Sequence, residues 1–332
     1  MSKKCLGCGI ELQDENVLNP GYTTNLDYDF CQRCFRLKNY GDYQVVDKSN
    51  EEYINILKKI DKTNDLVLYV VDILNIPENL KEIKEYVHNK MILVINKKDA
   101  IPKSVKDEKI INYFKDMNLF EEVIVVSANK NYNIDYLLSK IKFHQITKDV
   151  YIIGYTNAGK STLINKIMND YSDNDANLSI SALPSTTLDV LRLDVNDHLT
   201  LVDTPGVVSA TAITNFVSDD ILKRINPKKE IKPKTYQMRK NQAVLIEDLV
   251  LVDYIEGIRN SFTVFVANSL KVRRMLNNRH DDLKNLSKRT YETNFSEDLV
   301  IEGLGFIKIM ERGVIEVYVD KDVKTYLRKS LI

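Results

Sequence analysis

The sequence predicts an α/β fold with a mostly parallel sheet, preceded by a small cysteine-containing segment and followed by a β-rich α+β region. Between residues 50 and 225, short apolar runs rich in β-branched residues alternate with amphipathic stretches, a pattern that indicates strand–helix repeats and a parallel sheet. A glycine-rich loop follows one of these runs, and all four cysteines lie before residue 35. Because open parallel sheets bind ligands at the carboxyl ends of their strands, the loops after the apolar runs form the candidate site.

The chain divides into three predicted domains. Residues 1–45 hold the cysteines with little apolar periodicity, residues 50–217 hold the alternating pattern, and residues 218–332 form the C-terminal region. Residues 142–149 resemble a connector within the middle domain, and helices are expected to begin near residues 102–104 and 157–158. Residues 299–319 predict β-structure, with a short helix expected from residue 321. The predicted strands of the middle domain are 66–71, 91–95, 123–126, 150–153, 190–195 and 199–202.

A phosphate-binding loop follows the fourth predicted strand. Residues 154–161 read GYTNAGKS and fit G-x-x-x-x-G-K-[ST] between an apolar run and a helical stretch, which is the context this motif requires. Backbone N–H groups of such a loop converge on phosphate oxygens, Lys160 places a positive charge near the β- and γ-phosphates, and the Ser161 hydroxyl is a ligand for Mg²⁺. The other nucleotide-binding residues predicted in this loop are Asn157, Ala158, Gly159 and Thr162.

Two motifs that respond to the γ-phosphate lie downstream. Residues 203–206 read DTPG, which predicts Asp203 beside Mg²⁺ and a Gly206 N–H that reaches the γ-phosphate and senses its loss. Either Thr186 or Thr187 is expected to supply a hydroxyl to Mg²⁺, and Thr187 is the catalytic candidate of the two. The predicted catalytic residues are therefore Lys160, Thr187, Asp203 and Gly206.

Two motifs that read a guanine base lie upstream of the phosphate loop. Residues 96–99 read NKKD and residues 127–130 read SANK, each directly after an apolar run. A carboxylate such as Asp99 accepts two hydrogen bonds from the Watson–Crick edge of guanine, which adenine cannot offer, so GTP is favoured over ATP. The base-reading motifs (G4 and G5) thus precede the phosphate loop (G1) and the two γ-phosphate motifs (G2 and G3). The order G4-G5-G1-G2-G3 is a circular permutation of the usual order, which starts with G1. The predicted base-site residues are Asn96, Lys97, Asp99, Ser127 and Ala128.

The cysteines form two CxxC pairs, Cys5 with Cys8 and Cys31 with Cys34. Two such pairs chelate one tetrahedral Zn²⁺, as in a treble-clef finger. The competing interpretations are two disulfides or a redox-active pair, but the sequence shows no signal peptide, which favours zinc. Folding of residues 1–45 is then expected to depend on the metal.

These motifs together resemble the YqeH-type family of circularly permuted GTPases that act in ribosome assembly. The resemblance extends through most of the chain and includes Gln13 and residues 19–22, which read NPGY. It implies GTP hydrolysis at a slow intrinsic rate, coupled to assembly of the small (30S) ribosomal subunit or its precursor, with rRNA as a partner.

The residues after the DTPG motif bear on how water is activated. Many GTPases place a water-orienting glutamine there, whereas this chain has Val207 and Val208. The family shares this replacement, which is similar to GTPases in which K⁺ supplies the missing positive charge. The residue that corresponds to the K⁺ ligand is Asn157, and the alternative is that Asn157 only stabilises the turn of the loop.

Two loops depart from the family pattern. Ser185 stands where relatives have a glycine in the first switch, and Asn131 and Asn133 replace glycines after the SANK motif. Asparagine tolerates a left-handed backbone better than most residues, so the loop at residues 131–133 is expected to keep its shape.

The net charge does not indicate a type of partner, whereas local clusters of basic residues could. The 332 residues contain 47 basic and 47 acidic side chains, so a nucleic-acid partner cannot be inferred from the total. Two basic clusters could follow an RNA backbone, with Tyr236, Phe262 and Phe265 as candidate base-stacking residues; the alternative is a solvated face and an ordinary half-buried strand. The clusters are Lys223, Arg224, Lys228, Lys229, Lys232, Lys234, Arg239 and Lys240, and Lys271, Arg273, Arg274, Arg279, Lys284, Lys288 and Arg289.

The sequence thus predicts a cytoplasmic GTPase with a zinc finger, without a membrane segment, that acts as a switch on the small ribosomal subunit. Its cofactors are GTP or GDP, Mg²⁺, Zn²⁺ and, by the family analogy, K⁺. One alternative is a GTP-dependent RNA-binding module or chaperone with little intrinsic hydrolysis. Another is a zinc-dependent nucleic-acid regulator.

Overall fold

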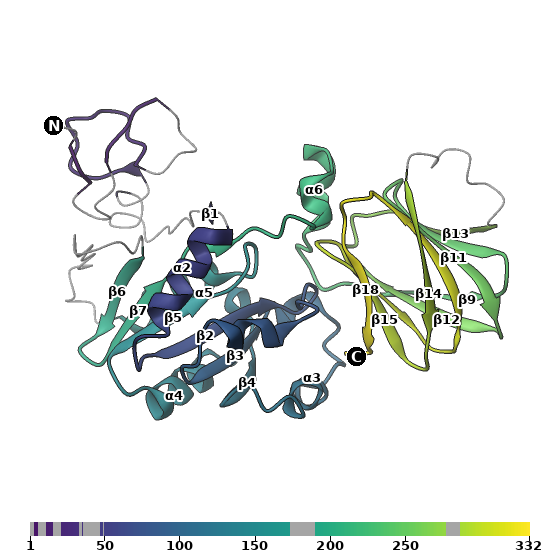
Figure 1. Cartoon of the computed structure of the whole chain (residues 1–332), viewed down its shortest axis with the longest axis horizontal. Helices are drawn as coiled ribbons and strands as arrows, with labels where there is room; N and C mark the ends of the chain where they lie inside the picture. The colour runs from purple at the N-terminus through teal and green to yellow at the C-terminus, as the bar shows by residue number, and fades with distance from the viewer. Residues whose placement is uncertain are drawn as a thin grey trace. The chain divides into compact units, whose positions relative to one another are not determined.

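A computed structural model describes residues 3–5, 11–15, 21–32, 35, 47–48, 50–172, 190–276 and 286–332. The chain forms two compact units (Figure 1). The nucleotide unit comprises Met1–Asp72, Asn79–Lys98 and Phe114–Val208, and the C-terminal unit comprises Ile73–Glu78, Asp99–Tyr113 and Ser209–Ile332. Two short segments from the first half of the chain therefore belong to the C-terminal unit.

The nucleotide unit is built on a six-stranded sheet with the order β4-β3-β2-β5-β7-β6. All neighbours are parallel except β6 and β7, which are antiparallel. The six predicted strands are confirmed, each end within one residue of its predicted position. The bounds are β2 (Leu66–Asp72), β3 (Met91–Asn96), β4 (Glu122–Val125), β5 (Asp149–Ile153), β6 (Leu191–Asn196) and β7 (Leu199–Asp203).

Both faces of the sheet are covered at β2, since all seven residues of this strand are buried. Leu66, Leu68 and Val70 share one apolar core with buried residues of α4 (Ile134–His144) and α5 (Lys160–Tyr171). The intervening residues point to the opposite face. Fully buried strands of this kind are typical of a parallel sheet covered by helices. The remaining elements of the first half are β1 (Asp47–Lys48), α2 (Asn50–Ile60), η1 (Leu80–Glu85), η2 (Lys98–Ala100), α3 (Asp107–Lys115) and η3 (Ala128–Lys130).

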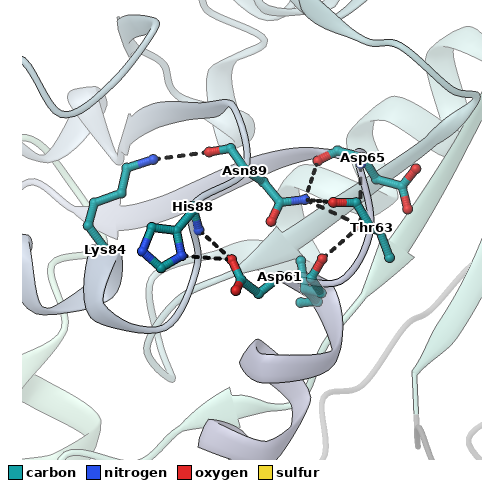
Figure 2. Close-up of polar contacts among 7 residues, drawn as sticks. Asp61, Thr63, Asp65, Lys84, His88 and Asn89 are labelled. Atoms are coloured by element: carbon teal, nitrogen blue, oxygen red, sulfur yellow. Dashed lines mark hydrogen bonds and ion pairs between the residues drawn. The ribbon is translucent and has the colours of Figure 1, made fainter.

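A polar cluster joins the loops at the amino ends of β2 and β3 (Figure 2). The Asp61 carboxylate accepts hydrogen bonds from the His88 backbone N–H at 2.7 Å and pairs with its ring Nδ1 at 3.0 Å. The Asn89 amide donates to the carbonyl oxygens of Thr63 and Asp65, each at 3.0 Å. These bonds fix the edge of the sheet opposite the strand ends where the nucleotide motifs lie.

The C-terminal unit contains two five-stranded antiparallel sheets, with the orders β13-β10-β11-β17-β14 and β18-β15-β16-β12-β9. Buried residues of both sheets form one core, so the sheets pack face to face. The bounds are η4 (Ile213–Asn215), α6 (Asp219–Ile225), β9 (Lys234–Met238), β10 (Gln242–Ile246), β11 (Val250–Gly257), β12 (Asn260–Phe265), β13 (Val272–Leu276), β14 (Ser287–Thr293), β15 (Glu297–Ile301), β16 (Gly305–Ile309), β17 (Gly313–Val319) and β18 (Thr325–Lys329); β8 (Gly206–Val207) belongs to the nucleotide unit and pairs with β1.

Three sequence-based expectations are corrected in this unit. The helix expected from residue 321 is wrong, because residues 325–329 pair as β18 with β15, so tertiary pairing overrides local propensity. The helix entry expected at residues 102–104 is also wrong, because a turn closes there, with the Val105 N–H donating to the Pro102 carbonyl oxygen at 3.0 Å, and α3 starts at Asp107. Phe262 and Phe265 are 0% and 6% exposed; they pack in the interior of the unit, which excludes base stacking. None of the described helices is both long and apolar enough to cross a bilayer.

Candidate nucleotide site

The phosphate loop joins β5 to α5, and its backbone depends on left-handed positions. Gly154 has φ +146°, Asn157 has φ 62° and Gly159 has φ 88°. A Cβ at Gly154 would clash with the Val70 carbonyl oxygen on the neighbouring strand. Glycine is therefore required at Gly154 both for its dihedral angle and for the close approach of β2. The loop leaves the sheet at the carboxyl end of β5, as the motif predicts.

Lys160 starts α5 and turns back over this loop. Its ammonium donates to the carbonyl oxygens of Gly154 at 2.8 Å and Tyr155 at 3.2 Å, and the residue is 3% exposed. A buried ammonium requires such acceptors. The charge is thus held at the loop, where phosphate oxygens are the natural ligand for a helix N-terminus and a convergent set of N–H groups. Ser161, which follows it, is half-buried, whereas Thr162 and Asn157 are exposed.

The DTPG motif lies beside the phosphate loop at the end of β7. The Thr204 hydroxyl donates to the Ile152 carbonyl oxygen at 2.9 Å, and the Thr156 N–H donates to the Val207 carbonyl oxygen at 2.8 Å. Gly206 is buried, and a Cβ added to it would lie 3.0 Å from Lys160 Nζ. Asp203 is 2% exposed. The structure therefore brings Lys160, Asp203 and Gly206 to one edge of the sheet.

The base-reading motifs join the phosphate loop through Asn96. Its Nδ2 donates to the Ala158 carbonyl oxygen at 3.0 Å, and its Oδ1 accepts from the Ala128 N–H at 3.2 Å. Ser127 Oγ accepts from the Lys130 N–H at 3.2 Å, which shapes the SANK turn. Asn131 and Asn133, with φ 53° and 59°, adopt the left-handed backbone that the sequence predicts. One buried amide thus links the three motifs despite their permuted order.

Lys97 makes an ion pair that the sequence did not predict. Its ammonium lies 2.8 Å from Asp72 Oδ2, and the Asp72 side chain is 8% exposed. The sequence alone favours a turn-capping role for Asp72, with a contact to the site from the carboxyl end of its strand as the alternative. The available signal was its position, because it ends β2 and pairs in register with Asn96 at the end of β3.

Tyr53 of α2 is a second residue that sequence reasoning missed. Its side chain is buried near the backbone of Gly154, and burial raises its pKa well above the usual value, so the hydroxyl stays neutral. The helical spacing of Tyr53, Ile56, Leu57 and Ile60, all buried, indicated an apolar face but not its place beside the phosphate loop. Tyr53 supports the phosphate loop from the helix that precedes the sheet.

The remaining predicted residues fall elsewhere. Asp99 lies in η2 and is the first residue of its segment in the C-terminal unit. Thr186 and Thr187 lie outside the described residues, as do Cys8 and Cys34. Cys5 and Cys31 are described: both are buried, and the Cys31 N–H donates to Cys5 Sγ at 3.1 Å. An N–H bond to sulfur stabilises a thiolate, so these two residues fit a metal site. Among the described residues alone, no group of three metal-ligating side chains occurs.

The site has the parts that phosphoryl chemistry on a nucleotide requires. A buried ammonium, backbone N–H groups and a helix N-terminus stabilise negative charge on phosphate oxygens. Mg²⁺, when bound, would supply further neutralisation of phosphate charge. The Ser161 hydroxyl and the buried Asp203 carboxylate are oxygen ligands of the type Mg²⁺ prefers.

Comparisons with known proteins agree with this chemistry. The family model described as RsgA GTPase matches residues 49–212, and the model described as 50S ribosome-binding GTPase matches residues 149–277. The chain is 32% identical to the Uncharacterized protein YqeH of Bacillus subtilis over 99% of both chains. It is 27% identical to human Nitric oxide-associated protein 1 over 58% of this chain, and it spans 36% of that protein.

A solved structure of GNP-bound YlqF from T. maritima is 19% identical and covers 52% of this chain and 71% of its own, with a TM-score of 0.35, too distant to add to the assignment. Both family models describe GTPases, so the chain binds and hydrolyses GTP. The similarity to YqeH extends over the whole chain, and the base-reading motifs precede the phosphate loop. The chain therefore belongs to the YqeH family of circularly permuted GTPases.

Proposed function

We propose that this GTPase is a switch in assembly of the small ribosomal subunit, and that it works in the cytoplasm on a precursor particle. The observation that carries the proposal is the arrangement of basic residues on the C-terminal unit. Part of each cluster lies on or beside β9 or β13, which occupy the edges of different sheets, whereas Lys288 and Arg289 of the second cluster lie on β14. The Tyr236 hydroxyl donates to the Val272 carbonyl oxygen at 2.9 Å, and Arg274 Nη1 donates to the Gln237 carbonyl oxygen at 2.8 Å. These bonds hold the two strands side by side.

The joined edge is a basic surface, which we call the β9–β13 edge. Its exposed cations come from both clusters, and phosphate contacts from such groups give RNA affinity that falls with salt. Arg279 and Lys284 of the second cluster lie outside the described residues. Tyr236 is half-buried and engaged in the bond above, so the surface recognises phosphates rather than stacked bases. The exposed members are Lys232, Lys234, Arg239, Lys240, Lys271, Arg273 and Arg274.

In the proposed mechanism, Lys160 and the Gly206 N–H stabilise charge that develops on the γ-phosphate as water attacks it. Ser161 and Thr187 would hold Mg²⁺, with Asp203 beside it. The residues proposed to read guanine are Asn96, Lys97, Asp99, Ser127 and Ala128; Asn157, Ala158, Gly159 and Thr162 complete the nucleotide contacts. Asn157 is the proposed ligand for K⁺; its exposed, left-handed position leaves its side chain accessible.

Zinc belongs to the proposal as a structural cofactor. Cys5, Cys8, Cys31 and Cys34 would hold it. The support is the pair of CxxC motifs together with the Cys31 N–H bond to Cys5 Sγ. The metal would fold residues 1–45, whose sequence has too little apolar periodicity to predict an independent core.

Binding to purified ribosomal subunits tests the proposed partner. The double variant Arg273→Ala, Arg274→Ala is expected to bind small subunits about tenfold more weakly at moderate salt and to show a shallower salt dependence. The matched control is Lys329→Ala, since Lys329 is exposed on β18 at the opposite edge of its sheet from β9. Equal affinity of wild type and double variant would remove the β9–β13 edge from the proposal. Preference for large subunits would reject the small subunit as partner.

A further inference from the structure

The loop that carries Asp99 is held by a segment that lies much later in the chain, and we propose that this segment thereby helps to determine guanine specificity. The segment concerned, residues 226–233, joins α6 to β9; we call it the strut. We assign Glu230 of the strut as a positioning residue for the base-reading loop. This assignment rests on the proposed reading of guanine by Asp99.

Two hydrogen bonds join the strut to the base-reading loop. The Ile231 N–H donates to the Ala100 carbonyl oxygen at 2.8 Å, and Glu230 Oε1 accepts from the Lys103 N–H at 3.1 Å. Glu230 and Lys103 are 127 positions apart in the sequence. The contact is also packed, because Ile231 is 1% exposed and Ala100 is 6% exposed. The loop is therefore held on both sides of Ile101, itself 1% exposed.

The strut is itself fixed from its other side by Asn268. The Asn268 amide donates to the Glu230 carbonyl oxygen at 2.8 Å, and its Oδ1 accepts from the Lys232 N–H at 2.8 Å. The Asn268 side chain thus binds the backbone on both sides of Ile231. Asn268 follows β12, which is paired on both sides in its sheet. Through Asn268, the loop is anchored to the sheet that contains β12.

Both sequence neighbours of Asp99 are held by backbone hydrogen bonds. Asp99 directly precedes Ala100, the residue whose carbonyl oxygen the strut binds. The other neighbour is also held, since the Lys98 N–H donates to the Val126 carbonyl oxygen at 3.0 Å. A carboxylate that must meet two guanine N–H groups needs donor–acceptor distances near 3 Å. Loosening the loop at residues 99–103 should weaken guanine contacts while phosphate contacts, made from the loop at 154–161, stay as they are.

The test compares affinities for GDP and ADP by competition against a fluorescent GDP analogue. Glu230→Ala is expected to raise the Kd for GDP about five- to tenfold, the effect of one lost hydrogen bond, with the Kd for ADP unchanged. Glu230→Gln keeps an acceptor oxygen and is expected to restore most of the discrimination. Asn268→Ala should act in the same direction as Glu230→Ala. The matched control is Glu256→Ala, because Glu256 is exposed on β11.

Two results would overturn the assignment. One is a GDP-to-ADP affinity ratio that Glu230→Ala leaves unchanged. The other is an equal loss for both nucleotides with a lower unfolding temperature, which would make Glu230 a purely structural residue. Asp99→Asn separates this inference from the proposed base site: it should weaken GDP binding and favour a xanthine nucleotide. If Asp99→Asn behaves so and Glu230→Ala does not alter the ratio, the strut fails while the proposed guanine site stands.

Discussion

The Asn96 side chain donates a hydrogen bond to the Ala158 carbonyl oxygen at 3.0 Å, across 62 positions of sequence. The first residue belongs to the NKKD motif and the second to the phosphate loop. Circular permutation has moved the chain ends without separating these motifs, because a side-chain bond between the end of β3 and the loop after β5, at the same edge of the sheet, does not depend on chain order. The site forms where loops at one edge of the sheet meet. The permuted order of the motifs changes only the path of the chain between these loops.

Asn96→Ala should weaken nucleotide binding. It removes the bonds to the Ala158 carbonyl oxygen and the Ala128 N–H inside a buried site, and losses of this kind amount to about 1–3 kcal/mol. We expect the Kd for GDP to rise about tenfold or more. Asn89→Ala is the control, because Asn89 is a buried amide at the other end of β3 (Figure 2). A control variant that lost as much GDP affinity as Asn96→Ala would contradict this account.

Gly154→Ala should destabilise the nucleotide unit. Alanine cannot adopt φ +146° without strain, and its Cβ would clash with the Val70 carbonyl oxygen. A cost of about 2 kcal/mol or more is expected, which lowers the unfolding temperature of this unit by roughly 4–8 °C. Differential scanning calorimetry measures the change, and the transition of the C-terminal unit serves as an internal reference. If the transition of the nucleotide unit did not shift, the spacing between β5 and β2 at Val70 would have adapted to the added Cβ.

The C-terminal unit should lose stability as pH rises toward neutrality. Burial, reinforced by Glu316 on the adjacent strand, raises the pKa of Asp253 to about 7. Because the folded-state pKa lies above the unfolded value, the protonated group adds stability that is complete below about pH 4 and lost as pH approaches 7. Asp253→Asn should remove this decline and stabilise the unit at pH 8 by on the order of 3 kcal/mol.

Urea unfolding at pH 5 and pH 8, followed by circular dichroism, measures the Asp253 effect. Asp248→Asn is the control, since Asp248 is exposed in the turn between β10 and β11. The same pH dependence in wild type and Asp253→Asn would assign the decline to other groups.

Zinc removal should affect the N-terminal segment and spare the nucleotide unit. We expect one Zn²⁺ per chain by elemental analysis, lost in Cys5→Ser because a thiolate ligand is removed. Chelation should make residues 1–45 sensitive to protease while the Kd for GDP stays within about twofold. Metal-free protein that resists protease but becomes sensitive on addition of a thiol reductant would instead indicate disulfides.

Sequence and structure agree best where a residue type has a single physical reason to be present. The glycines and Lys160 of the phosphate loop, and the apolar runs of the sheet, fall in this class. Long-range pairs do not: nothing local marks Glu230 as the partner of Lys103, or Asp72 as the partner of Lys97. Phe262 was a candidate for base stacking only because aromatic residues serve both cores and RNA surfaces, and its burial assigns it to the core.

Multiple-turnover GTP hydrolysis, with and without purified small ribosomal subunits, tests the central claim most directly. The assay compares wild type, Lys160→Ala and the control Lys166→Ala in K⁺ and in Na⁺; the control removes a half-buried ion pair with Asp170 on the same helix. We predict slow basal turnover that rises in K⁺ and rises further with small subunits. Lys160→Ala should reduce both rates about a hundredfold or more, and Lys166→Ala should match wild type. Tight GTP binding with no acceleration by small subunits, or equal acceleration by large subunits, would contradict a switch that acts on the small subunit.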